Sequence, residues 1–324
     1  MGANASGKTS LGRVMCAINN YLIGRSTEGV PLAICDKDKN ASFEVIYVTP
    51  ETRAINKLSA LLNISGLVRE EYAFLKLRKS KSLLDTLEEI DTIKPNFVYD
   101  INGEHSDIEN PGFKSVAFSK GRKLCGDYYS WNYMFCTSSS STNVGENTDV
   151  ELLKKILNAF DSSIMDVKKI QESSKNAYVI KFSNGDDVIT EDGKILDADR
   201  LSRGALESIE VASFVDFLMR NNDSTLFLDE KMAYSHSELE LSMLNLMIEK
   251  LGKNSQLFYT SHNYDVLEMN LPSHSYVFMR KKDFVEVIHP EKLGYTKNDR
   301  NLLGFVKNDV FETLPDTAKI EELL

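Results

Sequence analysis

The sequence is poor in cysteine and has no long apolar run. Its four cysteines form no C-x-x-C pair, and no histidine stands at metal-binding spacing from Cys16, Cys35, Cys125 or Cys136. We therefore expect reduced thiols, as in a cytoplasmic protein, rather than a disulfide framework or a zinc site. No apolar run approaches the roughly 18 residues of a membrane-spanning helix, so we expect no membrane partner.

Basic residues and glutamines are also few. The chain has 38 Lys and Arg against 48 Asp and Glu, a formal net charge of −10. Because nucleic-acid phosphates repel such a chain, broad sequence-independent nucleic-acid binding is not expected, although a local basic patch stays open. Gln171 and Gln256 are the only glutamines. The 324 residues, 42% of them hydrophobic, suffice for one large α/β domain with insertions or for two smaller domains.

A phosphate-binding motif stands at the beginning of the chain. Residues 2–9 read G-A-N-A-S-G-K-T and fit the P-loop pattern G-x-x-x-x-G-K-[ST]. The two glycines allow a tight turn whose N–H groups, with those of the following helix, face a phosphate. The lysine is expected to reach the β- and γ-phosphates, and the Thr9 hydroxyl to bind Mg²⁺. The residues expected to hold the nucleotide are Gly2, Asn4, Ala5, Ser6, Gly7, Lys8, Thr9 and Ser10.

Only Met1 precedes this motif. A P-loop normally follows a buried strand, and the sequence has no residues for that strand. We keep three interpretations: a misassigned start, a truncated chain, or another segment in the place of the strand. A P-loop that begins at residue 2 also leaves no room for a signal peptide.

The first half of the chain predicts strands followed by helices. Residues 31–35 and 43–49 have strand composition and predict an antiparallel pair. Residues 51–93 carry apolar side chains at helical spacing and predict several helical turns. Their basic cluster indicates a solvated helix face or a contact with nucleic acid or an acidic partner; it comprises Lys76, Arg78, Lys79 and Lys81. Within residues 94–148, the aromatic residues around Trp131 favour a core cluster over a base-stacking platform.

The second half has clearer periodicity. Residues 150–160 predict an amphipathic helix, and residues 178–190 a hairpin with an Asn184-Gly185 turn. Residues 298–324 are expected to form a helix. Ser202 and Gly204 precede a strongly apolar helix, whose free N–H groups are expected to bind a phosphate, although a plain N-cap gives the same pattern.

Two short strands follow, and each ends in polar side chains. Residues 225–229 are an apolar run typical of a buried parallel strand, and residues 257–262 form the next strand after a predicted helix. Because this connection makes the strands parallel, their carboxyl ends meet at one edge. Asp229 is expected to bind Mg²⁺, Glu230 to deprotonate the attacking water, and His262 to contact the γ-phosphate. A surface turn for the acids and a structural histidine are the alternatives.

In this order, GANASGKT, LSRG, LFLDE and TSH resemble an ABC-type ATPase. More narrowly, the chain resembles the soluble AAA-type ATP-binding proteins related to the RecF, SMC and OLD families. The resemblance covers the P-loop and residues 199–270. It implies Walker A at the P-loop, Ser202 and Gly204 as the signature motif, Asp229 and Glu230 as Walker B, residues 234–237 as the D-loop, and His262 as the switch histidine. The family's Q-loop glutamine has no candidate here, and Glu44 and Glu51 are considered as replacements.

The expected fold is therefore an α/β P-loop NTPase of the ABC-ATPase type. A mixed sheet flanked by helices would be formed by residues 1–50 and 199–324, with residues 51–198 as a helical or irregular insertion that contains the hairpin. The expected function is ATP binding and hydrolysis, with ATP and Mg²⁺ as cofactors.

By analogy with similar proteins, we expect a head-to-tail homodimer coupled to an effector protein in phage defence, DNA repair or a toxin–antitoxin module. Nucleic acid stays open as a partner. The alternatives are a nucleotide-gated binding module with little turnover and a truncated, inactive ATPase. A nuclease is disfavoured, because no acidic cluster beyond Asp229 and Glu230 is visible.

Overall fold

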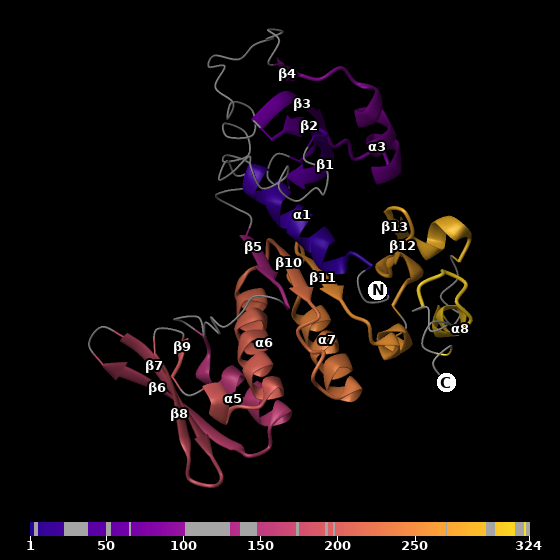
Figure 1. Cartoon of the computed structure of the whole chain (residues 1–324). Helices are drawn as coiled ribbons and strands as arrows, with labels where there is room; N and C mark the ends of the chain where they lie inside the picture. Colours follow the sequence, from indigo (N-terminus) through magenta and orange to yellow (C-terminus); the bar gives the residue numbers. More distant parts are fainter. Residues whose placement is uncertain are drawn as a thin grey trace. The chain divides into compact units, whose positions relative to one another are not determined.

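A computed structural model describes most of the chain (Figure 1). It covers residues 1–2, 6–22, 38–49, 53–64, 66–100, 130–136, 148–172, 175–191, 194–196, 198–269, 271–295, 302–314 and 321. Asn4, Ala5, Glu51 and the strand predicted at residues 31–35 lie outside these ranges. The chain divides into two compact units, Met1–Gly12 with Trp131–Leu324 and Arg13–Ser130. These units do not coincide with the three segments expected from the sequence.

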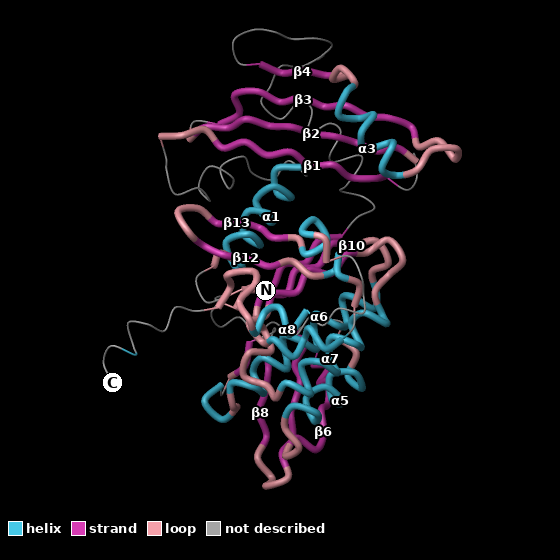
Figure 2. Tube along the Cα trace, turned by 90° about the vertical axis from the view of Figure 1, so that its right-hand side faces the viewer, coloured by secondary structure: helices cyan, strands magenta, loops and turns pink. Residues whose placement is uncertain are grey.

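The unit Arg13–Ser130 is built on an antiparallel sheet in the order β1-β2-β3-β4 (Figure 2). The strands are β1 (Ala41–Thr49), β2 (Ala54–Asn63), β3 (Gly66–Lys76) and β4 (Phe97–Asp100). The C-terminal part of helix α1 (Lys8–Leu22) packs on one face, where Ala17 and Tyr21 join the core around Leu58, Leu62 and Tyr72. Helix α3 (Leu83–Thr92) covers the other face through Ile90, which packs against Ile55.

The helical prediction for residues 51–93 is wrong over β2 and β3 and correct for α3. β2 has buried apolar residues on both faces, since Leu58 and Leu62 face α1 and Ile55 alone is buried on the opposite face against α3. Apolar residues on both faces of a strand give the same spacing as one face of a helix, so periodicity alone misassigns them. Helix α3 begins at a capping box, in which Ser82 and Asp85 bond each other's backbone N–H.

Other predictions for this unit have mixed outcomes. The strand predicted at residues 43–49 is confirmed as β1, but its partner in the described structure is β2. The basic residues Lys76, Arg78, Lys79 and Lys81 are all exposed. Glu44, considered as a Q-loop replacement, lies on β1 and pairs with Lys57 at 3.0 Å.

The other unit contains a sheet in the order β11-β10-β5. Its strands are β5 (Ser130–Met134), β10 (Ser224–Asp229) and β11 (Gln256–Thr260). β10 and β11 are parallel, as predicted, with Asp229 opposite Thr260. They are joined by helix α7 (Ser237–Lys250). Every residue of β10 is buried, so the strand carries Asp229 into the interior of this unit.

Helices α5 (Val150–Phe160), α6 (Arg203–Arg220) and α7 share one core with β10 and an antiparallel meander (Figure 1). The predicted helix 150–160 and the predicted hairpin are confirmed, and Gly185 in the hairpin turn has φ +89°. Each large apolar side chain buried in this core contributes about 1.5–3 kcal/mol. The meander comprises β6 (Ile164–Glu172), β7 (Lys175–Phe182), β8 (Asp187–Glu191) and β9 (Lys194–Ile195).

The C-terminal part of this unit contains a small antiparallel pair and several short helices. They pack around Phe278 and Phe311, whose rings stack at 4.6 Å. Of the helix expected at residues 298–324, the structure describes a short helix at residues 302–307. The elements are β12 (Phe278–Lys281), β13 (Val285–Ile288), α8 (Leu302–Lys307) and the 3₁₀ helices Tyr264–Met269, Ser273–Ser275 and Pro290–Leu293. A further 3₁₀ helix, Ala198–Arg200, precedes α6.

Gly12 of α1 provides a test of this packing. A Cβ atom there would lie 2.3 Å from the Phe227 ring and 3.0 Å from Phe135. Gly12→Ala should therefore overpack the site and lower the free energy of unfolding by about 1–3 kcal/mol in urea denaturation. The control is Gly304→Ala in α8, where a Cβ atom meets nothing within 4 Å; helix propensity should raise its stability by roughly 0.5–1 kcal/mol. Equal stability of both variants would contradict the packing.

Candidate functional site

The P-loop residues lie at the beginning of α1. Gly2 has φ +154° and Gly7 has φ +100°, and a Cβ atom on Gly2 would lie 2.3 Å from the Met279 carbonyl oxygen. The Met1 carbonyl oxygen accepts a hydrogen bond from Met279 N–H at 2.7 Å, which places the turn beside β12. Ser6 is buried, and its Oγ has no hydrogen-bond partner within the described ranges. Ser10 is exposed.

Lys8 is buried and faces an acidic side chain. Its Nζ lies 3.1 Å from Glu230 Oε1 and donates a hydrogen bond to the Gly2 carbonyl oxygen at 2.8 Å. A buried ammonium group is costly unless it is paired. The ion pair therefore stabilises Lys8 at the beginning of α1 and joins the P-loop to the acidic end of β10.

Asp229 is fully buried and accepts three hydrogen bonds. Its Oδ2 accepts from Thr9 Oγ1 at 2.7 Å and from Cys136 Sγ at 3.2 Å. Its Oδ1 accepts from Thr260 Oγ1 at 2.6 Å. Burial, and secondly the hydrogen bond to this carboxylate, raise the pKa of the Cys136 thiol. The structure thus brings the two predicted metal ligands, Thr9 and Asp229, into direct contact.

Glu230 occupies a strained position just beyond β10. Its φ is +48°, in the left-handed region that non-glycine residues rarely adopt. The backbone N–H of Glu230 donates to the Thr260 carbonyl oxygen at 3.1 Å, and Glu230 Oε1 lies 3.8 Å from His262 Nδ1. Such strain persists where surrounding contacts enforce it, and it is concentrated at functional sites. The separation of 3.8 Å makes the predicted base, Glu230, a neighbour of the predicted histidine, His262.

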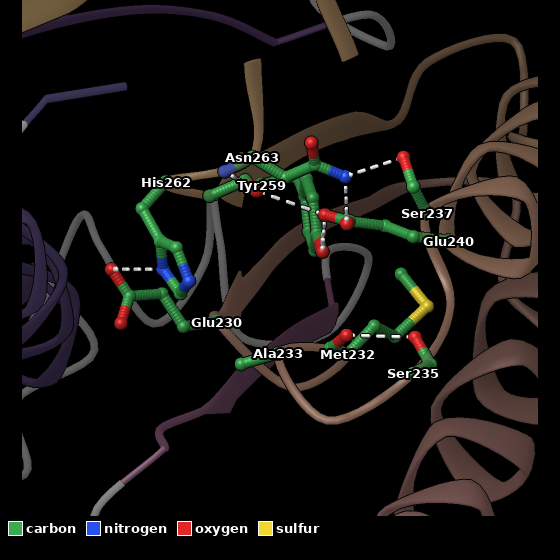
Figure 3. Close-up of a pocket in the computed structure, with 10 residues that line it drawn as sticks. Glu230, Met232, Ala233, Ser235, Ser237, Glu240, Tyr259, His262 and Asn263 are labelled. Carbon is green, nitrogen blue, oxygen red and sulfur yellow. Dashed lines mark hydrogen bonds and ion pairs between the residues drawn. The ribbon is translucent and has the colours of Figure 1, made fainter. Parts of the chain in front are cut away.

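A cavity of about 290 Å³ lies beside Glu230 and His262 (Figure 3). A buried carboxylate, Glu240 of α7, lines it and accepts hydrogen bonds from Tyr259 Oη at 2.6 Å, Ser261 Oγ at 2.9 Å and Asn263 Nδ2 at 2.7 Å. Burial is the main cause that raises the pKa of Tyr259. This network attaches α7 to both sides of His262.

The turn after Glu230 is held against α6. Lys231 is buried and pairs with Glu210 of α6 at 2.5 Å, and Met232 is fully buried. Burial raises the pKa of Glu207, also on α6, to about 7. The position of Glu230 thus depends on α6 as well as on the end of β10.

The predicted signature residues lie at the beginning of α6. Ser202 is the N-cap, and its Oγ accepts from Ala205 N–H at 3.1 Å. Gly204 is partly exposed, and a Cβ atom there would meet nothing closer than 3.8 Å. Arg203 donates to Tyr234 Oη at 3.3 Å and lies over its ring. In the part of the chain that the structure describes, no hydrogen bond joins Ser202 or Gly204 to Lys8 or Asp229.

Three residues at the site were not predicted as site residues. Thr260 is the first residue of the TSH motif but was given no role, and Glu240 belongs to a segment recognised as helix that no motif marks. Cys136 follows β5, in a segment without a recognisable pattern. Only the pairing of β5 beside β10 brings it to Asp229. A search for polar residues at the end of every candidate strand would have included Thr260 but not Cys136, because no strand was predicted before Cys136.

The residues present fit a nucleotide with a divalent cation. Ser6 leaves a buried hydroxyl without a partner in the described P-loop, and Lys8 supplies a buried positive charge. In the described residues, no group of three or more His, Cys, Asp or Glu side chains is arranged to hold a metal. A cation would therefore bind Thr9 and Asp229 and complete its shell with phosphate oxygens, as Mg²⁺ does in such sites. Within the same residues, no helix combines the length and apolar character needed to cross a membrane.

Comparisons with known proteins give a weak structural likeness. No protein-family model matches the chain, and no curated protein matches it. One similar solved structure is an SMC head bound to the C-terminal winged-helix domain of ScpA, with 13% identity, 90% of each chain covered and a TM-score of 0.48. Another is the SMC head domain from Thermotoga maritima, with 12% identity, 89% of this chain and 88% of that chain covered, and a TM-score of 0.41. These values are too low to assign the chain to a family.

The Glu240 network can be tested through stability. Glu240→Ala leaves the three donors on Tyr259, Ser261 and Asn263 without their acceptor, which should lower the free energy of unfolding by about 1–3 kcal/mol. The matched control is Glu249→Ala on the same helix, where the side chain is exposed and the change should stay within about 0.5 kcal/mol. Thermal denaturation of both variants measures the difference, and a neutral Glu240→Ala would contradict the network.

Proposed function

We propose that the chain binds ATP with Mg²⁺ and hydrolyses it at the site formed by the P-loop and the ends of β10 and β11. The observation that carries this proposal is the convergence of Lys8, Thr9, Asp229, Glu230 and His262. These are the residues that the motifs GKT, LDE and TSH predict. A glycine-rich turn that matched the P-loop pattern by chance would not be expected to lie beside two acids at the end of a strand and a histidine.

Each side chain has a role that its position supports. Lys8 would hold the charge of the β- and γ-phosphates, and Thr9 and Asp229 would bind the cation. Mg²⁺ supplies neutralisation of the phosphate charge when it is bound. Glu230 would accept a proton from the attacking water, and His262 would orient that water or contact the γ-phosphate. Because Lys8 and Glu230 attract each other, the phosphates would compete with this carboxylate for the ammonium group.

In the proposed function, Ser202 and Gly204 act on the ATP that a second copy of the chain binds. They lie at the beginning of α6, where Ser202 is exposed and Gly204 is partly exposed. Within the described residues, neither forms a hydrogen bond to Lys8 or Asp229 of the same chain. In a head-to-tail homodimer, the beginning of α6 would cap the ATP bound by the partner, since its N–H groups favour negative charge. ATP-dependent closure of two chains would then be coupled to an effector protein.

Binding and turnover can be separated by two substitutions. Lys8→Ala should abolish detectable binding of a fluorescent ATP analogue, because the buried charge for the phosphates is removed. Glu230→Gln should retain or tighten ATP binding, since a neutral amide attracts Lys8 less, and should slow hydrolysis by roughly 10²-fold or more. Glu238→Gln on exposed α7 surface is the control. Unchanged affinity in Lys8→Ala would overturn the P-loop assignment, and normal turnover in Glu230→Gln would exclude this residue as the base.

The composite site is tested by mixing two inactive proteins. Gly204→Asp places a carboxylate where the partner's γ-phosphate should dock, so like charges prevent closure. The open space around Gly204 accommodates the side chain, and Gly204→Asn controls for size. A mixed dimer of Gly204→Asp and Lys8→Ala chains contains one site with an intact P-loop and an intact α6, so mixing should restore ATPase activity.

A failure to recover ATPase activity on mixing has two causes to separate: mixed dimers do not form, or they form and are inactive. Mass spectrometry should first establish that mixed dimers form. Mixed dimers without recovered activity would then oppose the proposal unless both sites must act together, which a covalently linked dimer with one wild-type site can test. Full activity of Gly204→Asp alone would exclude the composite site and leave an ATPase that acts without α6 of a partner.

A further inference from the structure

A thiol lies beside the two residues that would bind the cation. Cys136 Sγ is 3.2 Å from Asp229 Oδ2 and 3.9 Å from Thr9 Oγ1, and these two oxygens are 2.7 Å apart. The three atoms come from α1, from the residue that follows β5 and Phe135, and from the end of β10. Cys136 is an exposed residue, and its thiol is partly buried where it contacts Asp229.

The position of Cys136 is set by packing rather than by a free loop. The neighbouring Phe135 packs against Phe227 of β10 with tilted rings, whose centroids are 5.9 Å apart, and Tyr133 stacks on the same ring at 5.8 Å. Gly12 of α1 approaches both Phe135 and Phe227 so closely that a Cβ atom would clash. Aromatic contacts of this kind therefore hold the segment before Cys136 between the P-loop helix and β10.

Two of the three separations between these atoms match those in a metal coordination sphere. Zinc binds sulfur at about 2.3 Å and oxygen at about 2.0–2.2 Å, so two ligand atoms of one such cation are separated by roughly 3–4 Å. The sulfur–oxygen separations of 3.2 and 3.9 Å lie in this range, and the oxygen–oxygen separation of 2.7 Å is slightly shorter. A small movement of Thr9 or Asp229 would allow all three atoms to bind one cation.

A second observation also indicates a ligand at this end of α1. Ser6 is 3% exposed, and its Oγ has no hydrogen-bond partner among the residues that the structure describes. A buried hydroxyl without a partner costs free energy that a bound ligand would recover. A ligand bound at the helix beginning that carries Thr9 would supply a partner for this hydroxyl.

We propose that Cys136 is a third protein ligand of the cation site formed by Thr9 and Asp229, and that it gives this site a preference for thiophilic cations of the Zn²⁺ and Cd²⁺ class over Mg²⁺. The inference rests on the proposed function for its first two ligands. A sulfur ligand favours softer cations, whereas a site of oxygen ligands alone suits Mg²⁺. When the cation binds the sulfur, the thiol proton is released to solvent.

The probe is Cd²⁺ added to the full chain without nucleotide. In the background variant, Cys16, Cys35 and Cys125 are replaced by Ser, so that Cys136 is the only thiol. Cd²⁺ should then produce an ultraviolet charge-transfer band that arises only from a cadmium–sulfur bond, with one cation bound per chain. Cys136→Ser in this background should remove the band and weaken Cd²⁺ binding by about 10- to 100-fold or more. A loss of this size is common even for residues that only hydrogen-bond to a metal ligand.

Two further measurements locate the cation and keep the result separate from the proposed function. Asp229→Asn in the same background should weaken Cd²⁺ binding by at least about tenfold. In the presence of ATP, Cys136→Ser should lower the ratio of Cd²⁺ affinity to Mg²⁺ affinity, because the site then has oxygen ligands alone. The thermal transition of each variant verifies that it is folded.

The inference would be overturned by a Cd²⁺ affinity that does not depend on Cys136, or by a band that survives in Asp229→Asn with unchanged affinity. In contrast, a Cys136-dependent and Asp229-dependent band in a protein that binds no ATP would support the cation site and oppose the proposed function. The two ideas can therefore fail separately.

Discussion

The buried carboxylate of Asp229 is the constraint on which the site depends. A carboxylate that is 0% exposed is costly unless donors or a cation compensate for lost water. Its donors come from α1, from β11 and from the segment after β5, through Thr9, Thr260 and Cys136. Each of these elements must therefore keep its place against β10, and the beginning of the P-loop helix is attached to the strand end that supplies the acids.

An ion pair lies next to Asp229. Lys8 is buried against Glu230, and Glu230 is itself held in a left-handed backbone conformation just beyond β10. The following turn is secured by the buried pair of Lys231 with Glu210 of α6. Because α6 also begins at Ser202, the helix that presents the proposed signature residues and the turn that carries the proposed base are parts of one packed core. A displacement of α6 would therefore change the position of Glu230.

The sequence predictions and the structure agree where consecutive residues determine a strand or a helix. The P-loop, the strand ending in Asp229 and Glu230, and the strand ending before His262 were all predicted from consecutive residues, and the parallel pairing of β10 with β11 follows from the length of the connection. In contrast, residues 54–76 were predicted as helix and form β2 and β3. Most of their buried apolar residues face α1, and Ile55 and Ala73 are buried on the opposite face against α3. Only the positions of α1 and α3 explain this pattern.

The sequence by itself determined the candidate phosphate cradle, the two strand-end acids, the histidine and the helix cap at Ser202, because each depends on neighbouring residues in the chain. Tertiary structure alone decided that Cys136 reaches Asp229, that Glu240 supports the segment around His262, and that Lys8 pairs with Glu230. These contacts join residues 93, 19 to 23, and 222 positions apart. No local pattern encodes such distances, since the strand order and the packing of aromatic rings determine which remote side chains meet.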